Sequence, residues 1–157
     1  YVLDSGIDRP LLTALLVISL FLTCYYLKQA SSVDPGVIKP TQSPGKVLTT
    51  LGNKNQLDHR TFCTSCLVQK PQRSKHCRVC NRCVLRFDHH CPWTGQCIGR
   101  GNHLYFMLYL IALFTAGCLY AYLGCKFLFP SGGFTLREVL NARARHGYLF
   151  GFILLII

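Results

Sequence analysis

The stretch "CTSCLVQKPQRSKHCRVCNRCVLRFDHHCPWTGQC" occupies residues 63–97 and contains seven of the chain's ten cysteines. It is polar and has almost no hydrophobic periodicity, so it is too short to fold around an apolar core of its own. Its paired Cys-x-x-Cys units, with histidines between them, are typical of zinc ligands. We therefore predict a small domain over residues 61–103 that bound metal holds together.

The candidate ligands in this domain exceed by one those that two zinc ions need. A structural zinc takes four ligands, whereas the seven cysteines together with His76 and His90 offer nine. The side chains of His76 and Cys77 diverge because the residues are adjacent, which predicts that they serve different ions in interleaved sites. A RING finger would close with a second Cys-x-x-Cys pair, which this spacing lacks. Disulfides are disfavoured in a reducing cytosol.

Cys91 is the cysteine that we expect to be free of metal, because it alone follows an Asp-His-His run. A thiol is mostly protonated at neutral pH, an imidazole can accept its proton, and a carboxylate can orient that imidazole. The pattern predicts Cys91 as a nucleophile, His89 as its general base and Asp88 as the residue that orients His89. The alternative is that Cys91 binds zinc and His89 only supports the site from outside.

Two uncharged apolar runs flank the cysteine-rich stretch, at residues 10–27 and 104–125. Each is long enough to cross a bilayer as a helix. Twelve Lys and Arg against three acids lie between Lys28 and His103, which predicts a cytoplasmic loop. The expected fold is an α-helical integral membrane protein with a small zinc-stapled domain of short β-hairpins. The remaining expected segments are a luminal tail (1–9), a cytoplasmic linker (28–60), a luminal loop (126–146) and the start of a further span (147–157).

The linker is rich in Pro, Gly, Ser and Asn over residues 30–56, which predicts irregular structure. Asp34-Pro35-Gly36 is a turn signal just after the first span. The sequence shows no repeat period. Because the chain begins without Met, we expect it to be an internal piece of a longer protein. Three further cysteines lie in or near the spans and are expected to be small apolar fillers: Cys24, Cys118 and Cys125.

The run from Cys63 to Phe106 resembles the DHHC-type protein S-acyltransferases, or palmitoyltransferases. The resemblance includes the Asp-His-His-Cys order, the Pro92-Trp93 pair that follows, Cys97 and Asn102. Asp34-Pro35-Gly36 resembles the second conserved element of that family. The residues around the motif are most similar to the ankyrin-repeat-bearing branch. The four or more spans of family members and their threonine-glutamate element are not within these 157 residues.

The resemblance implies a ligand set for each zinc. One set would be Cys63, Cys66, His76 and Cys83, and the other Cys77, Cys80, His90 and Cys97. It implies a two-step transfer of a long-chain acyl group from acyl-CoA, through an acyl-Cys91 intermediate, to substrate proteins with cytoplasmic cysteines. Trp93, Lys70 and Arg73 would contact the acyl-CoA, and an active site facing the cytosol from the Golgi or another endomembrane is implied.

Other basic residues are also available to the CoA phosphates or to anionic lipid: Lys75, Arg78, Arg82, Arg86 and Arg100. A nucleic-acid-binding zinc module would account for the net charge of +11, but spans on both sides argue against a nucleic-acid partner. The remaining alternative is a non-catalytic, membrane-anchored zinc scaffold that recruits partners.

Overall fold

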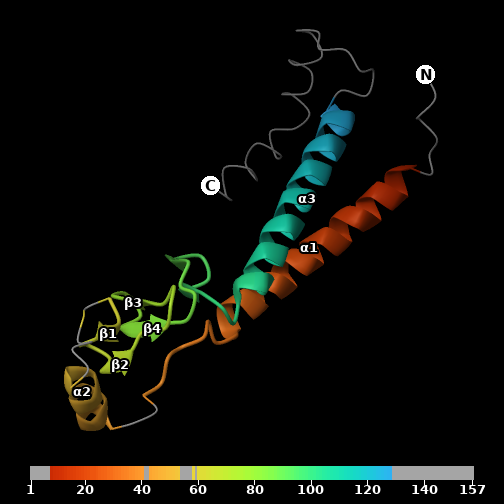
Figure 1. Cartoon of the computed structure of the whole chain (residues 1–157). Coiled ribbons are helices and arrows are strands. Elements are labelled where there is room, and N and C mark those ends of the chain that lie inside the picture. Colours follow the sequence, from red (N-terminus) through yellow and green to blue (C-terminus); the bar gives the residue numbers. More distant parts are fainter. Residues whose placement is uncertain (1–7, 41–42, 54–57, 59, 129–157) are drawn as a thin grey trace. The chain divides into compact units, whose positions relative to one another are not determined.

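The computed structural model describes residues 8–40, 43–53, 58 and 60–128 (Figure 1). The third span expected at 147–157 and most of the expected luminal segments lie outside these residues. One compact unit, Leu20–Leu113, contains all the hairpins, and the outer parts of the two long helices belong to a second unit. The elements in chain order are α1 (Asp8–Ser32), α2 (Pro44–Asn53), β1 (Phe62–Cys63), β2 (Val68–Gln69), β3 (Lys75–Cys77), β4 (Arg82–Val84), β5 (His89–Cys91), β6 (Gln96–Ile98) and α3 (His103–Leu128).

The cysteine-rich segment forms three separate antiparallel hairpins, β1–β2, β3–β4 and β5–β6. Each hairpin has a four-residue turn, at 64–67, 78–81 and 92–95. The last residue of each turn has a positive φ, which is 54° at Leu67, 49° at Asn81 and 66° at Gly95. The turns follow Cys63, Cys77 and Cys91, which are spaced fourteen residues apart. The prediction that the sequence has no repeat is therefore wrong. The geometry of the turn repeats every fourteen residues, although the three turns share few side chains.

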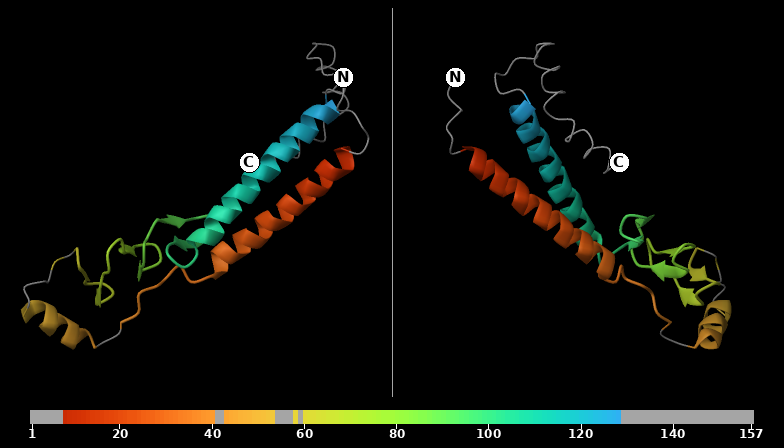
Figure 2. Two further views of the ribbon diagram at one scale, coloured as in Figure 1. Left: turned by 45° about the vertical axis from the view of Figure 1, so that its right-hand side comes forward. Right: turned by 180° about the vertical axis from the view of Figure 1, so that it is seen from behind.

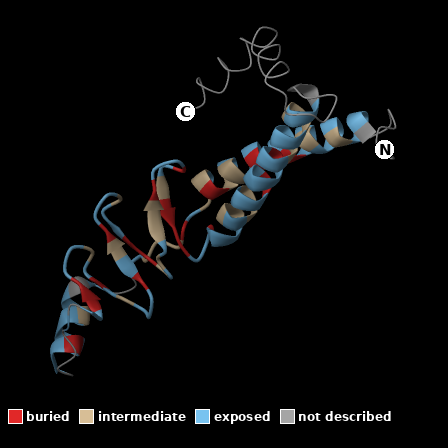
Figure 3. Ribbon diagram, turned by 90° about the horizontal axis from the view of Figure 1, so that it is seen from above, coloured by how far each residue is buried: buried red, intermediate tan, exposed pale blue. Residues whose placement is uncertain are grey.

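Each hairpin contains buried residues (Figure 3). Five of them are cysteines: Cys63, Cys77, Cys83, Cys91 and Cys97. One buried cluster joins Cys63 and Cys83 to Val68, and the other joins Cys77 and Cys97 to Val84. Apolar clusters of this size bury too little surface to stabilise a domain. Their composition agrees with the prediction that metal, rather than hydrophobic packing, holds this segment together.

Helices α1 and α3 are continuous over their whole length (Figure 2). Their apolar parts, Arg9–Ser32 and His103–Lys126, are 24 residues each with mean hydropathy 2.0 and 1.9, long and apolar enough to cross a membrane. Only 6% and 11% of their most apolar windows are buried, so neither is the core helix of a described domain. Both extend beyond the runs expected from the sequence, because helices continue through flanking polar residues until a turn ends them.

The linker departs from the expected irregular structure, because residues 44–53 form α2. Val47 is half-buried and Leu51 is buried, one helical turn apart on the same face. These side chains line a groove with Leu67 and Val68 of the first hairpin. Packing of an apolar face can override a composition rich in glycine and proline, which explains the difference.

The Asp34-Pro35-Gly36 segment, where the sequence predicts a turn, follows α1 and docks on the hairpins. Asp34 Oδ1 accepts hydrogen bonds of 2.8 Å from the backbone N–H groups of Gly36 and Val37. These bonds favour the carboxylate and lower the pKa of Asp34 below its ordinary value. Three backbone hydrogen bonds then join the segment after α1 to the zinc domain: Ile38 N to Cys83 O, Leu85 N to Gly36 O and Gly101 N to Pro35 O.

Candidate metal centres and nucleophile

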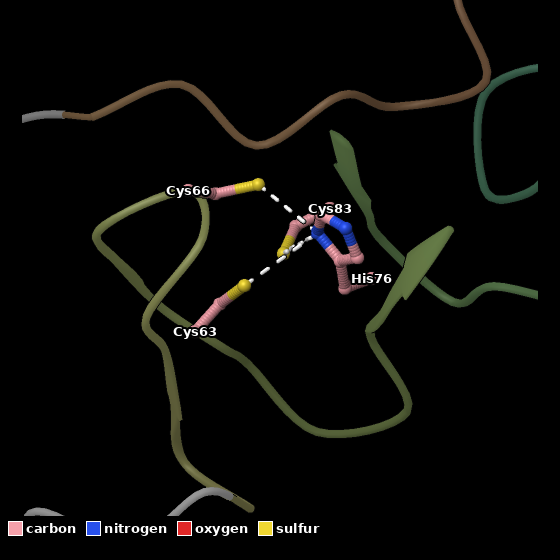
Figure 4. Close-up of side chains that lie close together, drawn as sticks. All are labelled: Cys63, Cys66, His76 and Cys83. Atoms are coloured by element: carbon pink, nitrogen blue, oxygen red, sulfur yellow. Dashed lines mark hydrogen bonds between the residues drawn. The ribbon is translucent and has the colours of Figure 1, made fainter. Parts of the chain in front are cut away.

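The first candidate metal centre joins the first two hairpins. Cys63 and Cys66 lie at the first turn, and His76 and Cys83 come from β3 and β4. The three sulfur atoms point toward the His76 imidazole (Figure 4). Its Nδ1 atom lies 3.6 Å from Cys63 Sγ, 3.2 Å from Cys66 Sγ and 3.9 Å from Cys83 Sγ.

The second centre repeats this arrangement one hairpin later. The turn residues are Cys77 and Cys80, and His90 and Cys97 come from β5 and β6. His90 Nδ1 lies 3.8, 3.3 and 3.9 Å from the sulfur atoms of Cys77, Cys80 and Cys97. Cys80 Sγ and Cys97 Sγ are 3.4 Å apart.

These distances fit a tetrahedral zinc ion. With Zn–S near 2.3 Å and Zn–N near 2.0–2.1 Å, a tetrahedron has S–N edges of about 3.6 Å and S–S edges of about 3.8 Å. The four ligand atoms of each cluster lie within 4.8 Å of one another. Three thiols and one imidazole are the donor set of a closed structural zinc site. The two clusters contain the same eight residues that the family resemblance implied.

Strand alternation explains why the two sites interleave. Successive side chains of a strand point to opposite faces, so His76 and Cys77 on β3 diverge. His76 is paired with Cys83 across the β3–β4 hairpin, so both ligands of the first site lie on one face. Cys77 faces the other way and belongs to the second site. Metal bound at both clusters would therefore cross-link the three successive hairpins into a chain.

Protonation of the ligand cysteines opposes metal binding at one member of each cluster. Burial, strengthened by hydrogen bonding to Cys63 and Cys66, raises the pKa of the Cys83 thiol. Burial also raises the pKa of Cys97, with Cys80 and Cys77 as its neighbours. At Cys63, burial is outweighed by hydrogen bonds from the backbone, chiefly from Cys66 N–H, and its pKa is lowered. Zinc must displace the proton of each buried thiol, so its affinity rises with pH.

Cys91 is the only cysteine of the three hairpins that belongs to neither cluster. It occupies the position in the third turn that Cys63 and Cys77 occupy in the first two. Thr94 stands where each of the first two turns has its second cysteine. Its hydroxyl donates a hydrogen bond to Cys91 O at 3.3 Å. On β5, His89 and Cys91 share one face and His90 points to the other, toward the second cluster. The thiol side chain is buried, with 3% of Cys91 exposed.

Asp88 lies within reach of two imidazoles. His89 Nδ1 is 3.4 Å from Asp88 Oδ2, and His103 Nε2 is 3.8 Å from the same oxygen. The His89 ring also meets the edge of Phe106, with centroids 5.2 Å apart. The orientation of His89 by Asp88 stays a prediction. His103 is an additional neighbour that the sequence analysis did not predict.

The residues expected to contact acyl-CoA lie in different parts of the zinc domain. Trp93 is 83% exposed in the same turn as Cys91. Lys70 follows β2, and Arg73 is an exposed residue with φ 63° just before β3. Trp93 is close to Cys91 along the chain, and Arg73 O accepts a hydrogen bond of 3.0 Å from Phe87 N, directly before the Asp88–His89 pair.

The sequence analysis did not predict several residues that build the site. Gln96 and Asn102 bind the end of α1 through their side-chain amides. Gly99 packs so closely against Val84 and Pro35 that a methyl group does not fit. The fourteen-residue spacing would have revealed the third turn, but these contacts join residues that are far apart in the chain.

Comparisons with known proteins agree with this geometry. The family model described as DHHC palmitoyltransferase matches residues 56–156. Palmitoyltransferase ZDHHC17 of Rattus norvegicus is 53% identical over 93 residues, which are 59% of this chain and 15% of that protein. Palmitoyltransferase ZDHHC13 of Mus musculus is 48% identical over 98 residues, which cover 62% and 16% of the two chains.

Palmitoyltransferase Hip14 of Drosophila melanogaster is 38% identical over 163 residues, which cover 98% of this chain and 25% of that protein. The chain thus spans between 15% and 25% of the length of these relatives. They bear out the branch expected from the residues around the motif. The matched metal ligands, the Asp-His-His-Cys order and the family model agree, and the chain belongs to the DHHC palmitoyltransferase family.

Proposed function

We propose that the protein containing this chain is a protein S-acyltransferase, with Cys91 as the residue that carries the acyl group. The main support is that two closed Cys₃His clusters take every other cysteine of the hairpins and leave Cys91 beside the Asp88–His89 pair. A pure scaffold has no need for an unliganded thiol at this position. The relatives named palmitoyltransferases support the same activity.

The proposed reaction exchanges thioesters in two steps. Cys91 gives its proton to His89, and its sulfur attacks the carbonyl carbon of acyl-CoA. The bond from that carbon to the CoA sulfur breaks, and CoA leaves with the proton from His89. A cysteine of a substrate protein then gives its proton to His89 and takes the acyl group, and Cys91 leaves as a thiol. Since one thioester replaces another, positioning and proton transfer supply most of the rate.

The two metal sites support this chemistry from outside the reaction. Zinc bound at both would cross-link the three hairpins and fix the strand β5 that carries His89 and Cys91. Asp88 holds the imidazole by its Nδ1 atom and leaves Nε2 for the proton that is transferred. That tautomer suits a base that must accept and return one proton.

The apolar helices support a place in the membrane for this site. We propose that α1 and α3 span a bilayer and that the hairpins face the cytosol, because the segment between them carries an excess of Lys and Arg. An acyl chain buried beside the helices would gain about 0.8 kcal/mol per methylene. The exposed Trp93 is suited to the membrane interface or the mouth of such a site. A Golgi or other endomembrane location is supported by the family resemblance alone.

We further propose that basic residues of the hairpins bind the phosphates of CoA, with Lys70 and Arg73 favoured by the family resemblance. Their charge is compatible with this role, since the segment holds twelve Lys and Arg against three acids. Substrate proteins would present cysteines on the cytosolic side. Both partners follow from the proposed reaction.

The test is acylation of the zinc-loaded protein in membranes with a clickable long-chain fatty acyl-CoA. We expect a hydroxylamine-sensitive label that Cys91→Ser abolishes while both metals are retained. The matched control is Cys24→Ser, because Cys24 is an exposed cysteine of α1 outside the clusters and its loss should leave the label. A label that survives Cys91→Ser would contradict this assignment, and a wild type without any label would favour the scaffold.

A further inference from the structure

The third hairpin differs from the other two in how its turn is held. The first two turns each supply two thiols to a metal cluster that the next hairpin completes. In the third turn, Cys91 and Thr94 stand at those two places, and no further hairpin follows before α3 begins at His103. Among the described residues, no metal cluster includes this turn. His90 ties β5 to the second cluster on the face opposite Cys91, so something other than metal must fix the turn that begins at Cys91.

The side chain of Gln96 supplies such a link. Gln96 is the residue directly opposite Cys91 in the β5–β6 register. Its Nε2 atom donates to Ala30 O at 2.6 Å and to Val33 O at 3.0 Å. Ala30 lies in the last turn of α1, and Val33 directly follows the helix, where its N–H still bonds to Gln29 O. The last carbonyls of a helix have no partner within the helix, so they are available to an amide from elsewhere.

Asn102 makes a second link to the same place. Its Nδ2 atom donates to Ala30 O and to Cys97 O at 3.0 Å each, and its Oδ1 atom accepts from Gly99 N at 2.9 Å. Asn102 and Ala30 are both fully buried. Ala30 O thus accepts hydrogen bonds from two side-chain amides, whose residues come before and after the ligand Cys97 in the sequence. We call Gln96 and Asn102 the amide pair.

We propose that the amide pair positions the nucleophile by holding the third hairpin on the end of α1, with Gln96 as the residue that fixes Cys91. This inference rests on the proposed function. The two donors of Gln96 take the place that metal ligation has in the earlier turns. If α1 spans the bilayer, the amide pair also sets the height of the thiol relative to the membrane surface. The Gln96 amide binds carbonyls at the end of α1 rather than the reacting atoms, so it is a positioning residue.

Replacement of Gln96 separates this role from metal binding. Gln96→Met keeps the length of the side chain and removes both donors, whereas Gln96→Asn keeps an amide on a shorter stem. Gln69→Met is the matched control, because Gln69 is an exposed residue of β2 in the first hairpin. All variants are made in the protein that contains this chain, in membranes and loaded with zinc.

The first readout is independent of catalysis. Because Cys91 is only 3% exposed, we expect slow modification of its thiol by N-ethylmaleimide, followed by mass spectrometry of the peptide that contains it. In Gln96→Met the rate should rise about tenfold, as expected when a buried group loses one or two hydrogen bonds. Both zinc ions should remain bound, and Gln96→Asn should fall between wild type and Gln96→Met.

The second readout is the rate of acyl-enzyme formation over a range of palmitoyl-CoA concentrations. We expect kcat to fall about tenfold in Gln96→Met with KM unchanged, which corresponds to about 1.4 kcal/mol at the transition state. Wild-type maleimide and acylation rates in Gln96→Met would overturn the proposal, as would loss of zinc from that variant. If the wild type itself forms no acyl-enzyme, the proposed function fails, and the maleimide rates still decide whether Gln96 holds the third turn.

Discussion

Gly99→Ala should destabilise the zinc domain. Apart from Gly101, no other described glycine should cost as much stability when it is replaced by alanine. An added Cβ at Gly99 would lie 2.5 Å from Val84 Cγ1, 2.6 Å from Pro35 O and 2.9 Å from Leu85 O. Two of these three atoms belong to the backbone and cannot rotate away. The methyl group therefore has to push the Asp34-Pro35-Gly36 turn off the hairpins.

The cost follows from what that movement breaks. Overpacking of a close contact costs about 1–3 kcal/mol. The Gly101 N to Pro35 O and Leu85 N to Gly36 O bonds, at 3.1 and 2.8 Å, would also weaken. At about 1 kcal/mol for each bond, the total is about 3–5 kcal/mol. Because folding of such domains is coupled to metal binding, a loss of about 3 kcal/mol should weaken zinc retention about 100-fold.

Competition with a coloured chelator on the purified protein in detergent measures this loss. The chelator concentration that removes half of the zinc should fall about 100-fold in Gly99→Ala. The matched control is Gly117→Ala in α3, where an added Cβ meets nothing within 4 Å and zinc retention should be unchanged. Zinc retention in Gly99→Ala equal to wild type would refute the argument that this close approach holds the turn in place.

Four further changes test other parts of the structure. Cys77→Ala should lower the bound zinc, measured by elemental analysis, from two ions to one and abolish acylation, whereas Cys91→Ser should keep both; full acylation after loss of the metal would show that it is not needed. Trp93→Ala should slow acylation while thermal unfolding changes by less than about 0.5 kcal/mol, because Trp93 is 83% exposed, and an unaltered rate would remove it from the site. Ala116→Tyr should shift acylation toward shorter acyl-CoAs, because Ala116 is 97% buried (3% exposed) and a larger side chain there takes up space beside the helix; an unchanged profile would contradict this. Hydrogen bonds from Val37 and Gly36 lower the pKa of Asp34 below 3.8, so the stability that the Asp34 carboxylate contributes is complete above pH 3.8 and is lost as the pH falls through the lowered pKa. The difference in the amide exchange rate of Val37 between wild type and Asp34→Asn should therefore become smaller in acid. A difference that does not change with pH would be evidence against this role of Asp34.

The sequence by itself determined the chemistry of the site. Cysteine and histidine spacing predicted two interleaved zinc sites and one remaining thiol, because the number and type of zinc ligands are local properties that a pattern of residues records. The family resemblance implied which four residues form each site. The two apolar runs and the Asp34-Pro35-Gly36 turn were predicted for the same reason, since helix length and turn preference depend on neighbouring residues. The prediction of an irregular linker was wrong at α2, where packing of Leu51 against the first hairpin outweighs the Pro- and Gly-rich composition of the segment.

Only the tertiary structure decided what holds the free thiol in place. Gln96 reaches carbonyls 66 and 63 residues earlier in the chain, and Asn102 reaches one 72 residues earlier. Gly99 matters because Val84, Leu85 and Pro35 all approach it, and none of them is its neighbour in sequence. An amide or a glycine carries no signal of its distant partner, because the free energy of such a contact arises only after the chain has brought the two segments together.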